Sequence, residues 1–183
     1  MIYLCSSSPS RALLLEKFGV KFEQKSAYYD EEQITTSIAK DFVYTASKGK
    51  LESAIKAFGL ETPLLCADTV IASSDGQILR KPKNKEDAKR ILRLQSNSKI
   101  SIISSVHYQS KTQGFSNISA THYLFNCFDE VDLDAYLESG LWQGKAGGCM
   151  VEGFCKKYIL EVDGFESTAM GLQVEEVLPW LEV

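Results

Sequence analysis

Blocks of apolar positions, separated by polar and glycine-containing stretches, predict a chain in which strands and helices are mixed. Strands are indicated by short runs rich in Val, Ile and Leu, and helices by apolar residues that recur every three to four positions. The predicted strands are 2–5, 20–26, 64–72, 100–106, 118–128 and 158–162. The predicted helices are 11–18, 37–58, 85–94, 132–138 and 174–181, the last interrupted by Pro179. A hairpin turn is expected at Asp75-Gly76, and a polar loop at 109–116.

One acidic residue interrupts the strongly apolar run from Leu64 to Ala72. An unpaired charge is costly inside a buried strand, so Asp68 needs an explanation. Asp68 could end the strand and accept backbone hydrogen bonds in a turn, as aspartate commonly does. Periodicity alone slightly favours this interpretation. In the alternative, Asp68 lies on the floor of a cleft, where it holds a metal ion or accepts a proton.

A turn dense in hydroxyl groups joins the first predicted strand to the first predicted helix. The order strand, polar turn, helix presents backbone N–H groups and hydroxyls to an anion. Ser8 also fits an ordinary helix cap with Pro9 at the first helical position, and the two roles use the same geometry. The segment lacks the lysine of a P-loop.

Several lysines stand in segments that fit either ligand contact or solvent exposure. Lys50 lies within the long predicted helix, and Lys81 precedes Pro82, which holds it in an extended conformation. Lys145 lies in the glycine-rich segment 144–153, which can approach a ligand closely. The acidic turn at 28–32 is likewise typical of a solvated loop.

Composition limits the classes of protein that fit. The 183 residues suffice for one domain, or for one domain with two lobes, and the net charge of −4 argues against a duplex-binding protein. A small basic pocket is still compatible with that charge. The five cysteines include no CxxC pair, which argues against a zinc site or a disulfide framework. We expect Cys5, Cys66 and Cys127 to be buried apolar residues, and His107 and His122 to lie on strand surfaces.

No signal sequence or membrane-spanning run is recognisable, so we expect a cytoplasmic protein without a membrane partner.

The candidate residues share one chemical theme. Two acids, Glu31 and Asp68, accompany the hydroxyl-rich turn and a set of cations. The cations are Arg11, Lys50, Lys81 and Lys145. Carboxylates that hold Mg²⁺, together with cations that hold phosphate oxygens, are what hydrolysis of a polyphosphate requires.

These residues occur in motifs that resemble those of the Maf family, in the ITPase-like group of nucleoside triphosphate pyrophosphatases. The resemblance covers nearly the whole chain, in the family's order. The matching segments are 4–11 (LASxSPRR), 30–31 (DE), 67–70 (ADTV), 78–82 (ILGKP, with Arg80 for Gly), 144–148 (KAG) and 171–172 (GLP). Lys50 falls where the family has the lysine of its long helix.

The resemblance implies an enzyme that hydrolyses a nucleoside triphosphate to the monophosphate and pyrophosphate. It implies Asp68 as the general base or a metal carboxylate, Glu31 as a metal ligand, and Mg²⁺ or Mn²⁺ as the metal. The residues assigned to phosphate binding are Ser6, Ser8, Arg11, Lys50, Lys81 and Lys145. We also expect Lys81 to act with Asp68 in catalysis, and Thr69 and Glu152 to contact the substrate.

The family fold implied is an elongated α/β structure with a mixed twisted sheet, flanking helices and a central cleft between two lobes. Residues 1–183 would form one Maf-like domain. The resemblance also implies a homodimer, a role in nucleotide-pool sanitation (house-cleaning) and restraint of septum formation.

Three departures from the family pattern affect the expected substrate. Ser10 replaces the first of two arginines, Glu152 replaces a glutamine, and the SGxxH motif after the helix at 85–94 is absent. Ser10 and Glu152 fall where subfamilies differ in base choice, which leaves pyrimidine triphosphates (dTTP, UTP) and 7-methylguanosine triphosphate as candidates. Glu152 could accept hydrogen bonds from a base N–H edge, which slightly favours a guanine-type base.

Two other classes of function compete with this interpretation. A non-catalytic nucleotide-binding regulator of cell division on the same fold is favoured by the departures and opposed by the retention of Asp68, Glu31, Lys50 and Lys81. A nucleic-acid-binding module is opposed by the acidic net charge and by the lack of interleaved basic and aromatic residues. Mg²⁺-dependent release of pyrophosphate distinguishes the enzyme from the regulator.

Overall fold

A mixed sheet forms the centre of the molecule, of which a computed structural model describes residues 1–181. Its strands are β1 (Ile2–Cys5), β2 (Phe22–Lys25), β3 (Leu64–Ser73), β4 (Ile78–Leu79), β5 (Lys99–Gln109), β6 (Gly114–Phe125) and β7 (Ile159–Asp163). The order across the sheet is β2-β1-β3-β5-β6-β7, and β4 pairs with β3. Strand β1 is parallel to β2 and β3, whereas the other pairs are antiparallel.

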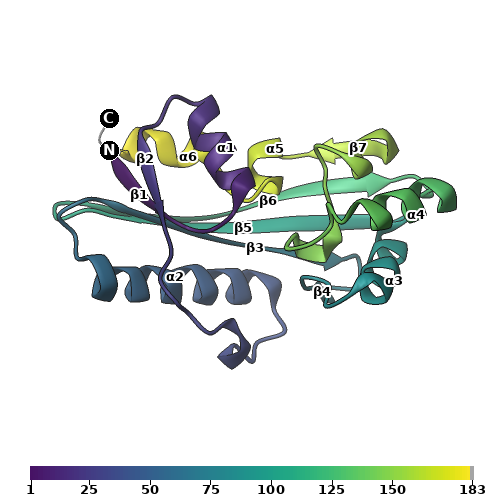
Figure 1. Ribbon diagram of the computed structural model, residues 1–183, viewed down its shortest axis with the longest axis horizontal. Helices are drawn as coiled ribbons and strands as arrows, with labels where there is room; N and C mark the ends of the chain where they lie inside the picture. Colours follow the sequence, from purple (N-terminus) through teal and green to yellow (C-terminus); the bar gives the residue numbers. More distant parts are fainter. Residues whose placement is uncertain (182–183) are drawn as a thin grey trace.

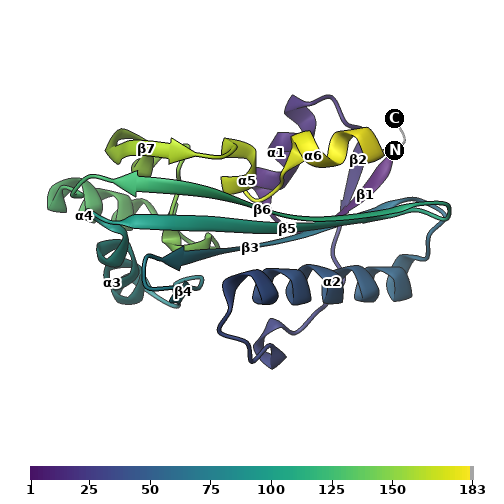
Figure 2. The same cartoon turned by 180° about the vertical axis from the view of Figure 1, so that it is seen from behind.

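Helices cover both faces of this sheet. They are α1 (Pro9–Lys17), α2 (Ala39–Phe58), α3 (Lys85–Gln95), α4 (Glu130–Ser139), α5 (Glu166–Ala169) and α6 (Val174–Val177). Short 3₁₀ turns are η1 (Glu31–Gln33), η2 (Ala146–Gly148), η3 (Phe154–Tyr158) and η4 (Leu178–Trp180). Figures 1 and 2 show α2 along one face, α1 and α6 on the opposite face at the same end, and α3 and α4 at the far end. The predicted mixed α/β fold with flanking helices is confirmed.

Separate apolar clusters hold these helices on the sheet. Phe42 and Val43 of α2 pack on Val70 of β3, and a second cluster joins α1, β1 and α6. A third cluster joins α3 and α4 to the far ends of β3, β5 and β6. Each fully buried aliphatic side chain contributes roughly 1.5–3 kcal/mol to stability. Among the described residues 1–181, no helix has the length and apolarity needed to cross a bilayer.

Strand β3 passes between the helix layers, and Asp68 lies in its middle. Asp68 is opposite Ser105 in the antiparallel pairing with β5, and the strand continues to Ser73. The slightly favoured interpretation, in which Asp68 ends the strand, is therefore wrong. The carboxylate is tolerated because cations from α1 and α2 lie beside it, as described below.

Several other elements and residues differ from the prediction. Strands β5 and β6 extend further toward one another than predicted, so that their connection shortens to residues 110–113. His107 is buried against the Tyr44 ring rather than exposed, whereas Cys127 is exposed rather than buried. The predicted C-terminal helix is divided into α6 and η4, because Pro179 lies in its second half. Helix α5 was not predicted.

Candidate active site

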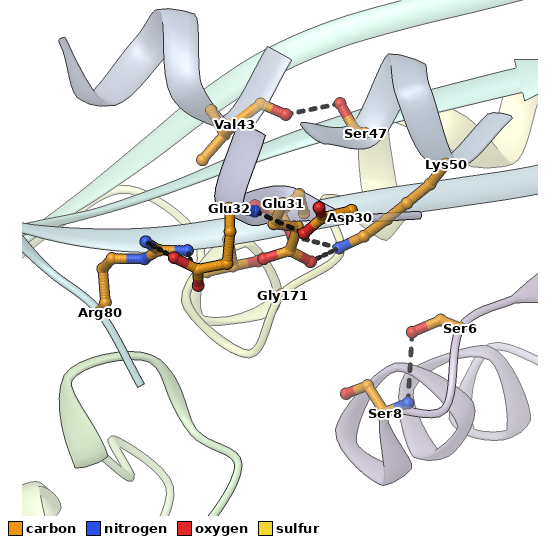
Figure 3. Close-up of polar contacts among 12 residues, drawn as sticks. Ser6, Ser8, Asp30, Glu31, Glu32, Val43, Ser47, Lys50, Arg80 and Gly171 are labelled. Atoms are coloured by element: carbon orange, nitrogen blue, oxygen red, sulfur yellow. Dashed lines mark hydrogen bonds and ion pairs between the residues drawn. The ribbon is translucent and has the colours of Figure 1, made fainter. Parts of the chain in front are cut away.

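The hydroxyl-rich turn caps α1. Ser8 Oγ accepts a hydrogen bond from the backbone N of Arg11 at 3.5 Å, and Pro9 occupies the first turn. The backbone N of Ser8 in turn donates to Ser6 Oγ at 3.2 Å, as Figure 3 shows. The predicted cap is confirmed, and it directs the start of α1 toward the middle of β3.

Arg11 is buried at this helix start and donates from three nitrogens. Nε donates to the carbonyl oxygen of Gly171 at 2.7 Å, one terminal nitrogen to Ser6 Oγ at 2.9 Å, and the other to Thr69 Oγ1 at 3.1 Å. Burial lowers the pKa of Arg11, and the charges of Asp68 and Glu31 oppose this shift. Because these acceptors are neutral, the guanidinium contributes a positive charge to the cleft wall.

Hydrogen bonds that continue from Arg11 through two hydroxyl groups link β3, β5 and α5. Thr69 Oγ1 lies 2.8 Å from Ser104 Oγ, and Ser104 Oγ donates to the carbonyl oxygen of Thr168 at 2.7 Å. Gln173 Nε2 donates to the Ser104 carbonyl oxygen at 3.1 Å. Sequence reasoning did not identify Ser104 or Thr168 as part of the site. The β3–β5 register places Ser104 opposite Thr69, and Thr168 is linked to the site through its hydrogen bond with Ser104.

Two carboxylates converge on Lys50 of α2. Lys50 Nζ lies 2.5 Å from Asp68 Oδ1 and 2.6 Å from Glu31 Oε1. Figure 3 shows the Lys50 side chain extended toward Glu31. Lys50 therefore supplies the nearby charge that a buried carboxylate in β3 requires.

The two carboxyl groups differ in their electrostatics. Burial raises the pKa of Asp68, Lys50 opposes that shift, and the negative charge of Glu31 adds to it. Burial also favours protonation of Glu31, but the charge and hydrogen bond of Lys50 outweigh this effect and lower the pKa of Glu31. Asp68 is thus the better proton acceptor near neutral pH, and Glu31 is the more firmly ionised group.

The donor set around Lys50 fits a divalent cation completed by substrate. Mg²⁺ is usually held by one or two carboxylates together with phosphate oxygens and waters, and Glu31 and Asp68 supply such a pair. Within residues 1–181, no group of three or more His, Cys, Asp or Glu side chains is arranged to hold a metal by itself. Glu31 and Asp68 could hold such a cation together with the oxygens of a phosphate-bearing ligand.

The remaining predicted cations, Lys81 and Lys145, also line the cleft. Lys81 is exposed and lies two residues beyond the end of β4. Lys145 Nζ lies 3.4 Å from Glu152 Oε1, and both side chains are partly buried. Gly147, which lies between Lys145 and Glu152 in the sequence, has a φ of 56° and lets the η2 segment turn sharply.

The η2 segment is tied to two other elements. Gln95 Nε2 of α3 donates to the Gly147 carbonyl oxygen at 2.7 Å, and the Gly147 N–H donates to the Arg80 carbonyl oxygen at 3.2 Å. Gln95 is the first residue of the stretch that replaces the SGxxH motif. This stretch therefore still supports the segment that carries Lys145.

All the predicted site residues line adjoining hollows that share Lys81. They are Ser6, Ser8, Arg11, Glu31, Lys50, Asp68, Thr69, Lys81, Lys145 and Glu152. Gly171, Met170 and Cys149 also line the cleft and were not predicted as site residues. The cleft combines carboxylates that can bind a metal or activate water with cations that can hold phosphate oxygens.

Known proteins resemble this chain over nearly its whole length. The family model described as "Maf-like protein" matches residues 1–183. A protein of a Nitratiruptor species named nucleoside triphosphate pyrophosphatase is 51% identical over 179 residues, which cover 97% of this chain and 96% of that protein. A protein of the same name from Helicobacter pylori is 37% identical over 182 residues, covering 100% and 95%. A dTTP/UTP pyrophosphatase of Pseudoalteromonas translucida is 28% identical over 175 residues, covering 96% and 92%. The chain therefore belongs to the Maf family.

Proposed function

We propose that this chain is a nucleoside triphosphate pyrophosphatase, which hydrolyses its substrate to the nucleoside monophosphate and pyrophosphate. The observation that carries the proposal is the convergence of Asp68 and Glu31 on Lys50 inside a cleft lined by further cations. The full-length relatives that bear this name support the same reaction.

In this reaction Asp68 takes a proton from water, whose oxygen attacks the α-phosphorus as pyrophosphate leaves. Burial suits Asp68 to this role, because it raises the pKa of the carboxyl group toward the working pH. Lys50 and Lys81 stabilise the negative charge that develops on the phosphates, and Arg11 does so from a fixed position. Ser6, Ser8 and Lys145 complete phosphate binding.

The proposal includes a divalent metal, Mg²⁺ or Mn²⁺, held by Glu31 and Asp68 together with the substrate. When bound, the metal would neutralise phosphate charge. Lys50, which lies against both carboxylates, keeps them oriented toward one point.

We assign Thr69 and Glu152 to substrate recognition. Thr69 is held between Arg11 and Ser104 beside the phosphate-binding turn. Glu152 also lines the cleft, where its carboxylate can accept hydrogen bonds from a base N–H edge. Candidate substrates are dTTP, UTP and 7-methylguanosine triphosphate. The relative named dTTP/UTP pyrophosphatase supports the pyrimidine candidates, and the acceptor chemistry of Glu152 supports a guanine-type base.

The biological setting proposed with this activity is a cytoplasmic homodimer without nucleic-acid or membrane partners. Each chain would be a single Maf-like domain over residues 1–183, with two lobes around the cleft. Its role would be nucleotide-pool sanitation and restraint of septum formation.

The experiment that tests the proposal is a panel of canonical and modified nucleoside triphosphates incubated with Mg²⁺ or Mn²⁺, with pyrophosphate and orthophosphate measured separately. We expect pyrophosphate from one or two substrates, loss of activity in a chelator, and recovery on addition of Mg²⁺. If the folded protein releases no pyrophosphate from any member with either metal, the proposal is wrong. A nucleotide-binding regulator would then be favoured.

A further inference from the structure

Glu31 differs from the other residues of the cleft in its support. Asp68 lies in a central strand and Lys50 in a long helix, whereas Glu31 begins the three-residue turn η1. The long connection between β2 and α2 carries this turn, so sheet pairing does not fix its position. Yet Glu31 Oε1 lies 2.6 Å from Lys50 Nζ. The placement of Glu31 must therefore come from side-chain contacts of its neighbours.

One such contact is the packing of the Tyr29 ring on Gly49 of α2. A Cβ atom added at Gly49 would lie 2.1 Å from Tyr29 Cε2 and 2.2 Å from Cζ, which is far inside contact distance. The ring therefore occupies the space of a side chain at position 49. Gly49 directly precedes Lys50 in the sequence, so the ring is seated next to the ion pair.

The glycine itself has no backbone reason to be there. Gly49 is inside the 20-residue helix α2 and is not among the glycines with positive φ. Glycine costs about 1 kcal/mol relative to alanine inside a helix. The contact with Tyr29 explains why a glycine stands at this position.

A second contact holds the other side of η1. Both terminal nitrogens of Arg80 donate to the Glu32 carboxylate, at 3.0 and 3.2 Å, as Figure 3 shows. The Arg80 guanidinium also lies 5.3 Å from the centre of the Phe42 ring of α2. Because Arg80 and Glu32 are both exposed, this ion pair contributes little stability by itself. Its two-point geometry nevertheless restricts the orientation of the turn.

We propose that Tyr29, seated on Gly49, is a positioning residue that holds the Glu31 carboxylate beside Lys50 and Asp68, with the Glu32–Arg80 pair as the second anchor. The consequence for turnover rests on the proposed pyrophosphatase function. The contact between Tyr29 and Gly49 and its effect on Lys50 do not depend on that function.

The test compares Gly49→Ala, Tyr29→Ala and the double variant. Lys48→Ala is the matched control, because Lys48 is the neighbouring exposed residue of the same helix. The first readout needs no ligand: the ¹⁵Nζ signal of Lys50 by NMR, with Glu31→Gln as the reference for loss of the Glu31 partner. The second readout is kcat and KM for pyrophosphate release. Circular dichroism and the melting temperature establish that each variant is folded.

We expect Gly49→Ala to move the Lys50 signal toward that of Glu31→Gln and to lower kcat about 10-fold or more, since small misplacements of catalytic groups are costly. KM should change less. In the Tyr29→Ala background, the added methyl at position 49 should have no further effect, because it acts only through the ring. Lys48→Ala should match the wild type.

Several results would overturn the inference. Wild-type Lys50 signals and kinetics in Gly49→Ala would show that the ring does not position Glu31. An equal effect of Gly49→Ala with and without Tyr29 would show that the methyl acts elsewhere. A change in KM alone in Tyr29→Ala would assign the ring to nucleotide contact instead. If Gly49→Ala does not fold, Tyr29→Ala carries both readouts. If the wild type releases no pyrophosphate, the proposed function fails, and the Lys50 signal still decides the positioning role.

Discussion

At Asp68, burial and two neighbouring charges act on a single carboxyl group. Only 5% of the residue is exposed, which disfavours its ionised form, and the positive charge of Lys50 partly compensates. Glu31 adds a negative charge to the same site. The result is a carboxylate with a raised pKa, held within hydrogen-bond distance of a cation, which is an arrangement suited to proton transfer.

Replacement of Asp68 by asparagine tests its role as the base. We expect Asp68→Asn to lower kcat by about 10²–10⁴-fold, the usual contribution of general base catalysis, while circular dichroism shows an intact fold. Asp75→Asn, in the exposed turn between β3 and β4, is the matched control and should retain activity. A rate close to that of the wild type in Asp68→Asn would remove the residue from this role.

The pH dependence of kcat/KM follows from the same electrostatics. The base must be ionised, so activity should rise with pH through the pKa of Asp68, and this limb should lie above the value of about 3.9 for an ordinary aspartate. Glu31→Gln removes a negative charge that raises the pKa of Asp68, so the limb should move to lower pH.

The Glu31→Gln variant should also require more Mg²⁺ for half-maximal activity. An unchanged Mg²⁺ titration would exclude Glu31 as a metal ligand.

Arg11 combines structural and electrostatic roles. Arg11→Lys keeps the charge, but a single ammonium cannot replace three nitrogens that donate to Gly171, Ser6 and Thr69. We expect the free energy of unfolding to fall by about 1–3 kcal/mol and KM to rise, measured by denaturant titration and steady-state kinetics. Arg90→Lys on the exposed face of α3 should change neither quantity appreciably. Wild-type stability in Arg11→Lys would contradict the role of the three-point contact.

The identity of the site residues could be predicted where the residue type is chemically unusual for its surroundings. Asp68 inside an apolar strand and Lys145 among glycines gave such signals. Ser104 gave none, because a serine in a strand is ordinary until the partner strand is known. The packing of Tyr29 on Gly49 could not be predicted either, because it depends on how the long connection between β2 and α2 folds back onto α2.

At the scale of elements, the η2 segment shows how a short turn can carry a functional side chain. Its backbone is held by α3 and by the end of β4, so Lys145 and Glu152 face the cleft from a supported position. The segment depends on glycine in two ways. Positive φ angles at Gly144 and Gly147 favour residues without a Cβ, and at Gly147 the surroundings are also crowded.

Alanine substitutions separate these two requirements. A Cβ at Gly147 would lie 2.9 Å from Ile71 Cδ1 and 3.1 Å from Gln95 Nε2, whereas a Cβ at Gly144 would meet no atom within 4 Å. Gly144→Ala should therefore cost about 1 kcal/mol from backbone strain alone, and Gly147→Ala clearly more. Denaturant unfolding measures the difference, and equal losses would show that crowding at Gly147 is relieved without cost. Only Gly147→Ala should also raise KM.

Helices with capping residues and clear periodicity could be predicted from the sequence, as α1, α3 and α4 show. The β5–β6 hairpin was predicted too short, because polar residues on its open face interrupt the apolar pattern that marks a strand. Helix α5 is only four residues long and has no side-chain cap, so local sequence signals could not reveal it.

At the scale of the whole molecule, a chain of net charge −4 places four basic residues around one cleft: Arg11, Lys50, Lys81 and Lys145. A triphosphate is attracted to that cleft by charges that salt screens over about 8–10 Å at physiological ionic strength. We expect KM to rise severalfold between low and high salt. Lys81→Met should raise KM at low salt and flatten this dependence, since Lys81 is exposed in the cleft. A KM independent of salt would argue against electrostatic attraction of the substrate.

The class of the fold could be predicted from the motifs, but the order of the strands could not. Sequence patterns identify β1 and β3 as strands, yet nothing local indicates that β1 lies between β2 and β3 in parallel. In that arrangement α1 and α2 lie on opposite faces of the sheet, as Figure 1 shows.

The hydrogen bond from Arg11 to the carbonyl oxygen of Gly171 joins residues 160 positions apart. During synthesis Arg11 emerges well before its acceptor, which follows 160 residues later in the chain. The cleft therefore cannot be completed until Gly171 has been synthesised. A chain that lacks Gly171 would leave the Arg11 guanidinium without one of its acceptors and would be inactive. In refolding experiments, activity should accordingly return in the slowest phase, after the sheet has formed, because contacts of such large sequence separation form late.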